Sequence, residues 1–289
     1  MATSAFTRLF GVIGHPVGHS LSPAMHSAAI EALGLDAVYL AFEVPPERVA
    51  GALEGMRAMG LRGLNVTIPH KAAVMSLVDD VDEAARRAQG VNTVTNDGGR
   101  LLGSSTDGPG FMRSLAEAGV EARGSEVLLV GSGGAARAIA ATLATEAKGI
   151  LVAARNPDAR SELVRAVREL GGVAEAMDLT ESSLCAGLQT CRMLINCTPL
   201  GMWPRTEACI PVRSEDMTAD HVVVDIVPNP TETMLLRRAA ERGAKIVDGL
   251  GMLVHQGAIS LEIWTGERAP VQAMRAAAEA ALEARRAAR

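Results

Sequence analysis

The chain has 289 residues, 48% of them hydrophobic and 21% charged, a length that predicts two medium-sized domains with cores of their own. The chain has a net charge of −5, whereas nucleic-acid-binding domains are usually basic, so we expect no nucleic-acid partner. No apolar run reaches membrane-spanning length and the first residues show no signal-peptide pattern, so we expect a cytoplasmic protein without a membrane partner.

The cysteines and histidines show no metal-ligand or disulfide spacing. Four cysteines lie between residues 185 and 209, without a CxxC pair among them. None of the six histidines forms an HExxH pattern. We therefore expect reduced thiols and no bound metal.

Strand and helix patterns alternate through the first hundred residues, which predicts a mostly parallel α/β sheet. Ser22 suits the N-cap of a helix that Pro23 begins. The runs VNTVTN and RLLGSS flank Asp97-Gly98-Gly99 and predict a hairpin, with a helix to follow. The expected strands are 8–14, 37–44 and 63–68, and the expected helices are 22–33, 46–59 and 106–118.

Polar groups follow the first and third expected strands, in the segments 19–22 and 65–71. Ligands of such sheets bind beyond the carboxyl ends of the strands, so these hydroxyl, amide and amine groups suit a small, hydroxylated ligand. Lys71 lies in the second segment and is one of only three lysines among 28 basic residues. A lone lysine is usually a solvated surface charge. Unlike arginine, however, lysine can release its proton near physiological pH, as general acid/base chemistry requires.

The stretch EVLLVGSGGAARAIAAT, residues 126–142, predicts a buried strand, a tight turn and a helix. Gly131, Gly133 and Ala136 match the G-x-G-x-x-G/A dinucleotide fingerprint, with Gly134 beside them. The glycines permit the turn and the approach of a pyrophosphate, and the alanine lets the helix pack against the strand. Because the motif begins after more than a hundred residues, we expect a different domain to precede it and to supply the other half of a site.

The next expected strand, 149–154, ends without the acidic residue that usually holds the ribose of NAD. It ends in Ala154-Arg155-Asn156, where Arg155 can pair with a 2′-phosphate. We therefore expect NADP, with NAD also possible, and Arg160 is a weaker second candidate for the phosphate. The remaining expected strands are 193–196, 222–225 and 245–248, and the helices are 158–170, 231–242, 252–265 (after a break at Gly249-Leu250-Gly251) and one after Pro270.

Several motifs occur in one order along the chain: HSLSP at 19–23, NVTIPHK at 65–71, VNT at 91–93, STDG at 105–108, GSGGAAR at 131–137, NCTPLGM at 196–202 and DGLGMLVHQGA at 248–258. In this order the chain resembles the shikimate dehydrogenase family, including its quinate/shikimate relatives. The resemblance implies an α/β fold of two domains: a mostly parallel substrate-binding and catalytic domain, and a Rossmann-type NADP-binding domain. The first would comprise 1–106 and 250–289, with a C-terminal helix returning to it, and the second 107–249.

The resemblance also implies roles for individual residues. Lys71 and Asp107 would form the catalytic pair, and Ser20 and Ser22 would hold the substrate carboxylate. Four further residues would bind the carboxylate side or the ring hydroxyls: Asn65, Thr67, Asn92 and Gln256. The residues expected at the cofactor are Gly131, Ser132, Gly133, Gly134, Ala135, Arg155, Asn156, Thr198, Met202 and Gly249.

The implied activity is the reversible, NADPH-dependent reduction of 3-dehydroshikimate to shikimate, a step of aromatic amino-acid biosynthesis, by a monomer or homodimer. One alternative is a quinate/shikimate or aminoshikimate-type dehydrogenase that uses NAD or NADP, because Pro228 stands where many family members have a substrate-contacting tyrosine. Two further alternatives are a non-catalytic ligand sensor of the same pathway and a two-domain dehydrogenase that acts on a folate cofactor.

Overall fold

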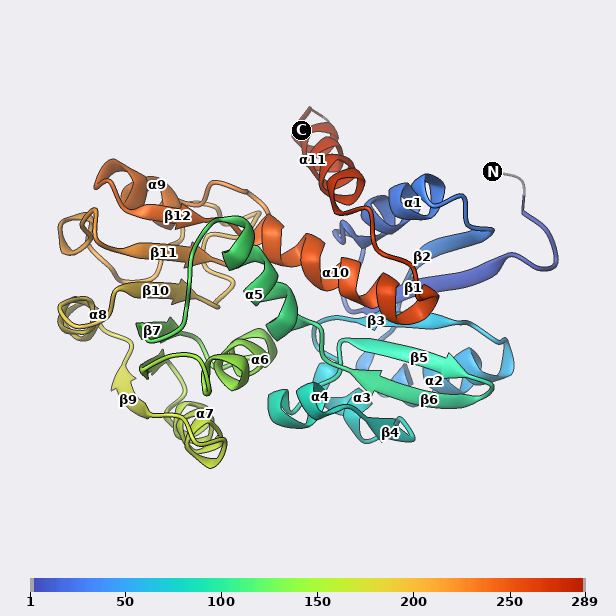
Figure 1. The fold of residues 1–289 in the computed structure, drawn as a ribbon, viewed down its shortest axis with the longest axis horizontal. Helices are drawn as coiled ribbons and strands as arrows, with labels where there is room; N and C mark the ends of the chain where they lie inside the picture. The colour runs from blue at the N-terminus through green and yellow to red at the C-terminus, as the bar shows by residue number, and fades with distance from the viewer. Residues whose placement is uncertain (1–2, 288–289) are drawn as a thin grey trace. The chain divides into compact units, whose positions relative to one another are not determined.

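Two six-stranded sheets organise residues 3–287, the part of the chain described by the computed structural model (Figure 1). Each sheet lies in a unit of its own. Unit 1 comprises Met1–Gly110 and Val254–Arg289, and unit 2 comprises Phe111–Leu253. The predicted α/β class, with two sheets rich in parallel strands, is confirmed. The assignment of substrate to one domain and cofactor to the other stays a prediction.

The sheet of unit 1 has the strand order β2-β1-β3-β5-β6-β4. β1 pairs in parallel with β2 and β3, whereas β5 and β6 form the predicted antiparallel hairpin. Gly98 and Gly99 close it with φ values of +59° and +96°, which glycine adopts without strain. The strands are β1 Arg8–Gly14, β2 Ala37–Glu43, β3 Gly63–Val66, β4 Asp80–Val81, β5 Thr93–Asp97 and β6 Arg100–Ser104.

Helices cover both faces of this sheet. Alternate residues of β1 point to opposite faces: Ile13 packs with residues of α2, whereas Phe10 and Val12 pack with residues of α1. The helices are α1 Ser22–Ala32, α2 Val49–Ala58 after the 3₁₀ turn Pro46–Arg48, α3 Lys71–Met75, α4 Glu83–Ala88 and α11 Val271–Ala287. The sequence interpretation missed α3, β4 and α4, because elements of two to six residues are too short to show a period.

The prediction that Ser22 caps α1 is wrong. Leu21 already has helical dihedrals, φ −93° and ψ −9°, so Ser22 lies inside the first turn and no side chain caps the helix. The backbone N–H of Ser22 instead donates to Ser20 Oγ at 3.2 Å. This contact links the two serines predicted to bind the substrate.

The sheet of unit 2 is entirely parallel, with the strand order β12-β11-β10-β7-β8-β9. This is the doubly wound order of dinucleotide-binding domains, and its direction reverses between β7 and β10. Ligands of such sheets bind beyond the strand ends at that point. The strands are β7 Glu126–Val130, β8 Gly149–Ala154, β9 Ala174–Asp178, β10 Met193–Asn196, β11 Val222–Asp225 and β12 Lys245–Val247.

Helices also cover both faces of this second sheet. Val127 and Leu129 of β7 pack with α6 and α7, whereas Leu128 and Val130 pack with α8 and α9. The sequence interpretation missed β9 and α8. β9 has only one fully buried residue, so its apolar pattern is weak. The helices are α6 Gly134–Leu143, α7 Pro157–Glu169, α8 Glu181–Leu188 and α9 Met234–Glu241.

Two helices, α5 Asp107–Glu117 and α10 Gly249–Thr265, contribute residues to both units. α10 begins three residues before its predicted start. Asp248 Oδ1 accepts hydrogen bonds from Leu250 N at 3.0 Å and Gly251 N at 3.1 Å, so it caps the first turn. The predicted break at Gly249-Leu250-Gly251 is therefore the capped start of the helix.

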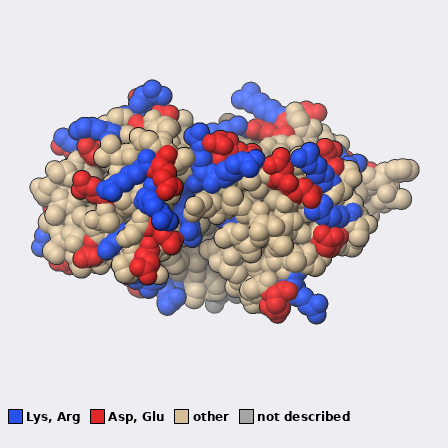
Figure 2. Space-filling model, turned by 90° about the horizontal axis from the view of Figure 1, so that it is seen from below, with Lys and Arg blue, Asp and Glu red and all other residues tan. Residues whose placement is uncertain are grey.

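Charges of both signs are interspersed on the face shown in Figure 2. Some exposed charges of the protein form short-range pairs on one helix, such as Arg87 with Glu83 at 2.8 Å. Such exposed pairs contribute little stability, about 0.3–0.5 kcal/mol each. Within residues 3–287, no helix is long and apolar enough to cross a membrane.

Candidate active site

Lys71 and Asp107 form an ion pair in unit 1. Lys71 begins α3 shortly after β3 ends, Asp107 begins α5, and Lys71 Nζ lies 2.5 Å from Asp107 Oδ2. Their side chains are 21% and 7% exposed, whereas that of Lys148, paired with Glu126, is 70% exposed. The structure therefore brings the two predicted catalytic residues together and withdraws them from bulk solvent.

The amide of Asn92 fixes the orientation of Asp107. Asn92 Nδ2 donates to Asp107 Oδ1 at 2.8 Å and to Thr106 Oγ1 at 2.9 Å, while its Oδ1 accepts from Thr106 N at 2.8 Å. Asn92 is only 2% exposed, so water has little access to its amide and does not compete with these hydrogen bonds. Each oxygen of Asp107 thus has its own donor, and the carboxylate is held toward Lys71.

Gln256 joins the same cluster. Asn92 Nδ2 lies 3.3 Å from Gln256 Oε1, which brings α10 beside the start of α5. A Cβ added to Gly110 would lie 2.7 Å from Gln256 N, so only glycine allows the two helices to approach this closely. The predicted residues Asn92, Asp107 and Gln256 are therefore neighbours in unit 1.

A buried polar layer lies behind the pair. Asn65 Nδ2 donates to Ser260 Oγ at 2.9 Å, and its Oδ1 accepts from Tyr39 Oη at 2.7 Å. Ser260 Oγ also lies 2.8 Å from Thr93 Oγ1. The sequence interpretation missed Ser260, Thr93 and Tyr39. The first two had a signal: Ser260 follows Gln256 by one helical turn, and Thr93 belongs to the VNT motif.

The other titratable groups in this layer stay neutral near physiological pH. His26 is fully buried and stacks on Tyr39 with ring centroids 4.2 Å apart. Burial lowers the pKa of His26 to about 3 and raises the pKa of Tyr39 above its usual range. Tyr39 therefore keeps its proton and acts as a donor to Asn65.

The loops after β1 and β3 carry the other predicted substrate residues. His15 N donates to Ile68 O at 3.0 Å and Thr67 N donates to Ile13 O at 3.0 Å, so the two loops run side by side. Ser20 and Thr67 are half-buried, and Ser22 is 7% exposed. His70, next to Lys71, is not available for the site, because its Nε2 is buried 2.7 Å from Val44 O.

In unit 2, the turn after β7 requires glycine at one position and leaves open space at another. Gly131 has φ +120° and lies against Cys197, so a side chain there would be strained and crowded. Gly133 is exposed, and no atom lies within 4 Å of the Cβ position, so the protein fold itself leaves this space open. Gly134 and Ala135 begin α6, which has no side-chain cap. Their N–H groups suit an anion, with Ser132 beside them.

The residues that follow β8 suit the 2′-phosphate of NADP better than the 2′-hydroxyl of NAD. Arg155 is exposed and has no ion-pair partner among residues 3–287, whereas Asn156 Oδ1 caps α7 by accepting from Asp158 N at 2.9 Å. Arg160, the weaker candidate, is engaged elsewhere: it donates to Asp178 Oδ1 at 2.7 Å. Arg155 is therefore the guanidinium at this turn that remains free to pair with a 2′-phosphate.

Thr198 and Met202 lie in the loop after β10. Asn196 Oδ1 accepts from Thr198 Oγ1 at 2.7 Å, and Asn196 Nδ2 donates to Asp225 Oδ1 at 3.0 Å. Asp225 is fully buried and also accepts from Thr233 Oγ1 at 2.7 Å, which ties this loop to the loop after β11. Met202 is half-buried in the same loop.

Gly249, the last predicted cofactor residue, is buried, and its packing alone requires glycine. A Cβ there would lie 2.3 Å from the carbonyl carbon of Ile226. The role of Gly249 at the cofactor stays a prediction.

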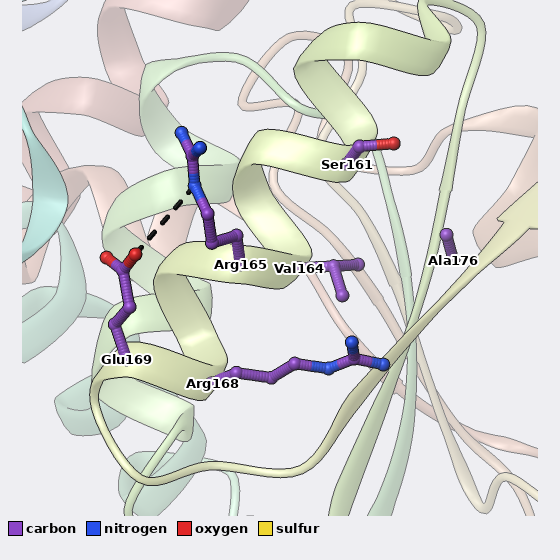
Figure 3. Close-up of a pocket in the computed structure, with 6 residues that line it drawn as sticks. All are labelled: Ser161, Val164, Arg165, Arg168, Glu169 and Ala176. Atoms are coloured by element: carbon purple, nitrogen blue, oxygen red, sulfur yellow. Dashed lines mark ion pairs between the residues drawn. The ribbon is translucent and has the colours of Figure 1, made fainter.

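A groove of about 500 Å³ lies between α7 and β9 in unit 2 (Figure 3). The charged side chains that line it already have partners: Arg165 pairs with Glu169 at 3.8 Å, and Arg168 Nε donates to Ala174 O at 2.9 Å. None of the predicted site residues lines it. The groove is therefore separate from the candidate site.

Comparison with known proteins identifies the family. The chain is 47% identical to shikimate dehydrogenase (NADP(+)) of Methanopyrus kandleri, over 98% of both chains. It belongs to the shikimate dehydrogenase family. Residues 12–94 match the family profile "Shikimate dehydrogenase substrate binding domain", and residues 249–279 match "Shikimate 5'-dehydrogenase C-terminal domain". The resemblance inferred from the motifs is thus confirmed.

Two solved structures show how the family varies. Shikimate 5-dehydrogenase of Listeria monocytogenes, solved with shikimate and NAD, is 36% identical, with a TM-score of 0.90 over 95% of this chain and 97% of that one. Quinate dehydrogenase of Corynebacterium glutamicum, solved with NAD, is 30% identical, with a TM-score of 0.86 over 94% and 98%. The same fold therefore occurs in relatives that are named for different substrates.

The buried carboxyl of Asp225 predicts a pH-dependent stability. Burial raises its pKa from 3.8 to about 6, so the unfolded chain loses this proton at lower pH than the folded protein does. The stabilisation that Asp225 contributes is present below about pH 4 and is lost as the pH rises through about 6, a change of about 2–3 kcal/mol. Asp225→Asn resembles the protonated form at every pH. The free energy of unfolding of this variant should therefore lack the part of the pH dependence that Asp225 causes.

Urea denaturation of both proteins at several pH values measures the difference. The free energy of unfolding of the wild type should fall relative to that of the variant between about pH 4 and pH 7. Parallel profiles would contradict the assignment of this titration to Asp225.

Proposed function

We propose that this protein is an NADP-dependent shikimate dehydrogenase, which reversibly reduces 3-dehydroshikimate to shikimate in aromatic amino-acid biosynthesis. The observation that carries the proposal is the partly buried pair Lys71–Asp107, held by Asn92 among amide and hydroxyl groups suited to a small polyol. The relative from Methanopyrus kandleri, named shikimate dehydrogenase (NADP(+)), supports it along the whole chain.

The loop after β1 binds the substrate carboxylate through the hydroxyls of Ser20 and Ser22. Asn65, Thr67, Asn92 and Gln256 bind the carboxylate side or the ring hydroxyls, and hydroxyl groups and amides suit a ligand with several such groups. A site built to bond hydroxyls discriminates strongly against analogues that lack them, because its buried polar groups would be left unpaired. This accounts for a polyol substrate better than for a folate.

Lys71 supplies the proton. When bound, the cofactor supplies the hydride to the carbonyl carbon, and the carbonyl oxygen then requires a proton. The Lys71 ammonium donates it, and Asp107 orients the amine through the 2.5 Å contact. In the reverse direction, the Lys71 amine accepts the proton from the shikimate hydroxyl.

The residues of unit 2 fit NADP. The open space at Gly133 and the uncapped start of α6 accommodate the pyrophosphate, and Arg155 pairs with the 2′-phosphate. Ser132, Gly134 and Ala135 belong to the same turn. Asn156, Thr198, Met202 and Gly249 complete the proposed cofactor set, with Thr198 held in place by Asn196.

One assay tests the function directly: the absorbance of reduced nicotinamide is followed with shikimate or quinate and with either NADP or NAD. We expect turnover of shikimate with NADP to be fastest. A higher kcat/KM for quinate with NAD would support the second candidate, a quinate dehydrogenase, which Pro228 favours. Binding of shikimate without reduction of either cofactor would indicate a sensor and contradict the proposal.

Lys71→Ala should lower kcat by about 10²–10⁴-fold, the usual effect of losing a positioned acid. Its dissociation constant for NADP should not change, because NADP binds through residues of unit 2. Lys148→Ala, which removes an exposed lysine, is the matched control and should keep wild-type kcat. A Lys71→Ala variant with kcat within about threefold of wild type would reject the role of Lys71.

Arg155→Ala should raise KM for NADP by about 10–100-fold, because a charge-assisted hydrogen bond to phosphate contributes about 1.5–3 kcal/mol. KM for NAD, which has no 2′-phosphate, should change little. Arg165→Ala on the outer part of α7 is the control. Equal losses for both cofactors in Arg155→Ala would show that Arg155 does not read the phosphate.

A further inference from the structure

The C-terminal helix contacts the loop proposed to bind the substrate carboxylate. α11 packs against α1 (Figure 1). A residue of its last turn reaches the loop that leads from β1 into α1. Arg285, in that last turn, donates from Nη1 to His19 O at 2.6 Å and from Nη2 to Ser20 O at 2.9 Å. One guanidinium therefore holds two successive carbonyl groups of the loop.

The remaining contacts anchor mainly the first half of this loop. His15 Nδ1 lies 3.1 Å from Glu43 Oε1, and Val17 N donates to Glu43 Oε2 at 3.4 Å. At the second half, Ser20 N donates to Val17 O at 2.9 Å, which is a turn within the loop itself. Of the contacts described for residues 19 and 20, only those of Arg285 attach this half to a distant element, the helix α11.

The guanidinium also brings a positive charge to the loop. Residues 15–22, HPVGHSLS, contain no lysine or arginine. The guanidinium lies 2.9 Å from the carbonyl oxygen of Ser20, the residue whose hydroxyl is proposed to bind the carboxylate. A positive charge at this distance favours a carboxylate ligand, and a planar fork fixes the two carbonyl groups more rigidly than an ammonium would.

We propose that Arg285 is a positioning residue for substrate binding: it holds the His19–Ser20 segment so that the Ser20 and Ser22 hydroxyls converge on the carboxylate of the substrate. The inference rests on the proposed function. It extends the site to the last turn of α11, beyond residue 279, where the match to the family profile ends. Arg285 acts through the loop and not on the reacting atoms.

Hydrogen exchange of the ligand-free protein tests the positioning role without any reaction. Arg285→Ala should raise the exchange rate of the amides of residues 17–21 several-fold, because the loop opens more often. Exchange in α2 should stay at its wild-type rate, which shows that the protein remains folded. Arg286→Ala, which removes the exposed neighbouring arginine, is the control and should leave the loop unchanged. Unchanged exchange in Arg285→Ala would overturn the proposal.

Kinetics with shikimate and NADP test the effect on the substrate. Arg285→Ala should raise KM for shikimate by roughly 10-fold while kcat stays within about threefold, because Lys71 and Asp107 are untouched. KM for NADP should not change. Arg285→Lys keeps the charge but loses the planar fork of donors, so its KM for shikimate should lie between that of the wild type and that of Arg285→Ala. Arg286→Ala should match the wild type.

The outcomes separate this inference from the function itself. Wild-type protein without turnover of shikimate would reject the proposed function, and hydrogen exchange would still decide whether Arg285 holds the loop. Wild-type turnover with equal KM values for Arg285→Ala and Arg286→Ala would leave the function intact and reject the role of Arg285. If kcat of Arg285→Ala falls by the same factor by which KM rises, and exchange in α2 is also faster, the substitution causes a general structural defect. This result would also reject the role of Arg285.

Discussion

The charge pair of Lys71 and Asp107 is the interaction on which this account depends. A half-buried amine and a buried carboxylate lose much of their hydration, and that loss is tolerated only where both groups have close partners. Here Asp107 has the Lys71 ammonium on one oxygen and the Asn92 amide on the other. The pair is thereby fixed in direction as well as in distance, which is what a proton donor at a single substrate oxygen requires.

The polar layer behind the pair explains how this direction is maintained. Asn65 comes from β3, Thr93 from the start of β5 with Asn92 directly before it, and Ser260 from α10, and their hydrogen bonds leave each amide one orientation. His26 and Tyr39 close the layer as neutral, stacked rings. Buried polar groups of this kind are stable when they are hydrogen-bonded together, and through these bonds Gln256 and Ser260 of α10 help to hold Asn92, the partner of Asp107.

The sequence predicted the long elements of both sheets, whereas short elements that carry or flank candidate site residues, such as α3 with Lys71, were missed. The dinucleotide motif follows a strongly apolar strand, and both β7 and α6 form where it predicts. Short elements such as β4 and α8 were missed because their patterns are weak. Ser22 misled the interpretation, since a serine before a proline resembles a cap, while the backbone of Leu21 decides where the helix begins.

Other features depend on distant contacts that no local pattern contains. Tyr39 lies 26 residues from Asn65 and Arg285 lies 265 residues from Ser20, so only the fold shows that they meet. The absence of an acidic residue after β8 could be read from the sequence, but the engagement of Arg160 by Asp178 could not. Motifs thus locate chemistry, whereas the partners that orient it come from tertiary structure.

A double-mutant cycle on kcat with Lys71→Ala, Asp107→Asn and the combined variant tests the central claim most directly. If Asp107 acts by orienting Lys71, the combined variant should lose little more than Lys71→Ala alone, because the two residues act as a unit. Losses that multiply, so that the effects of the two substitutions are independent, would contradict a catalytic pair.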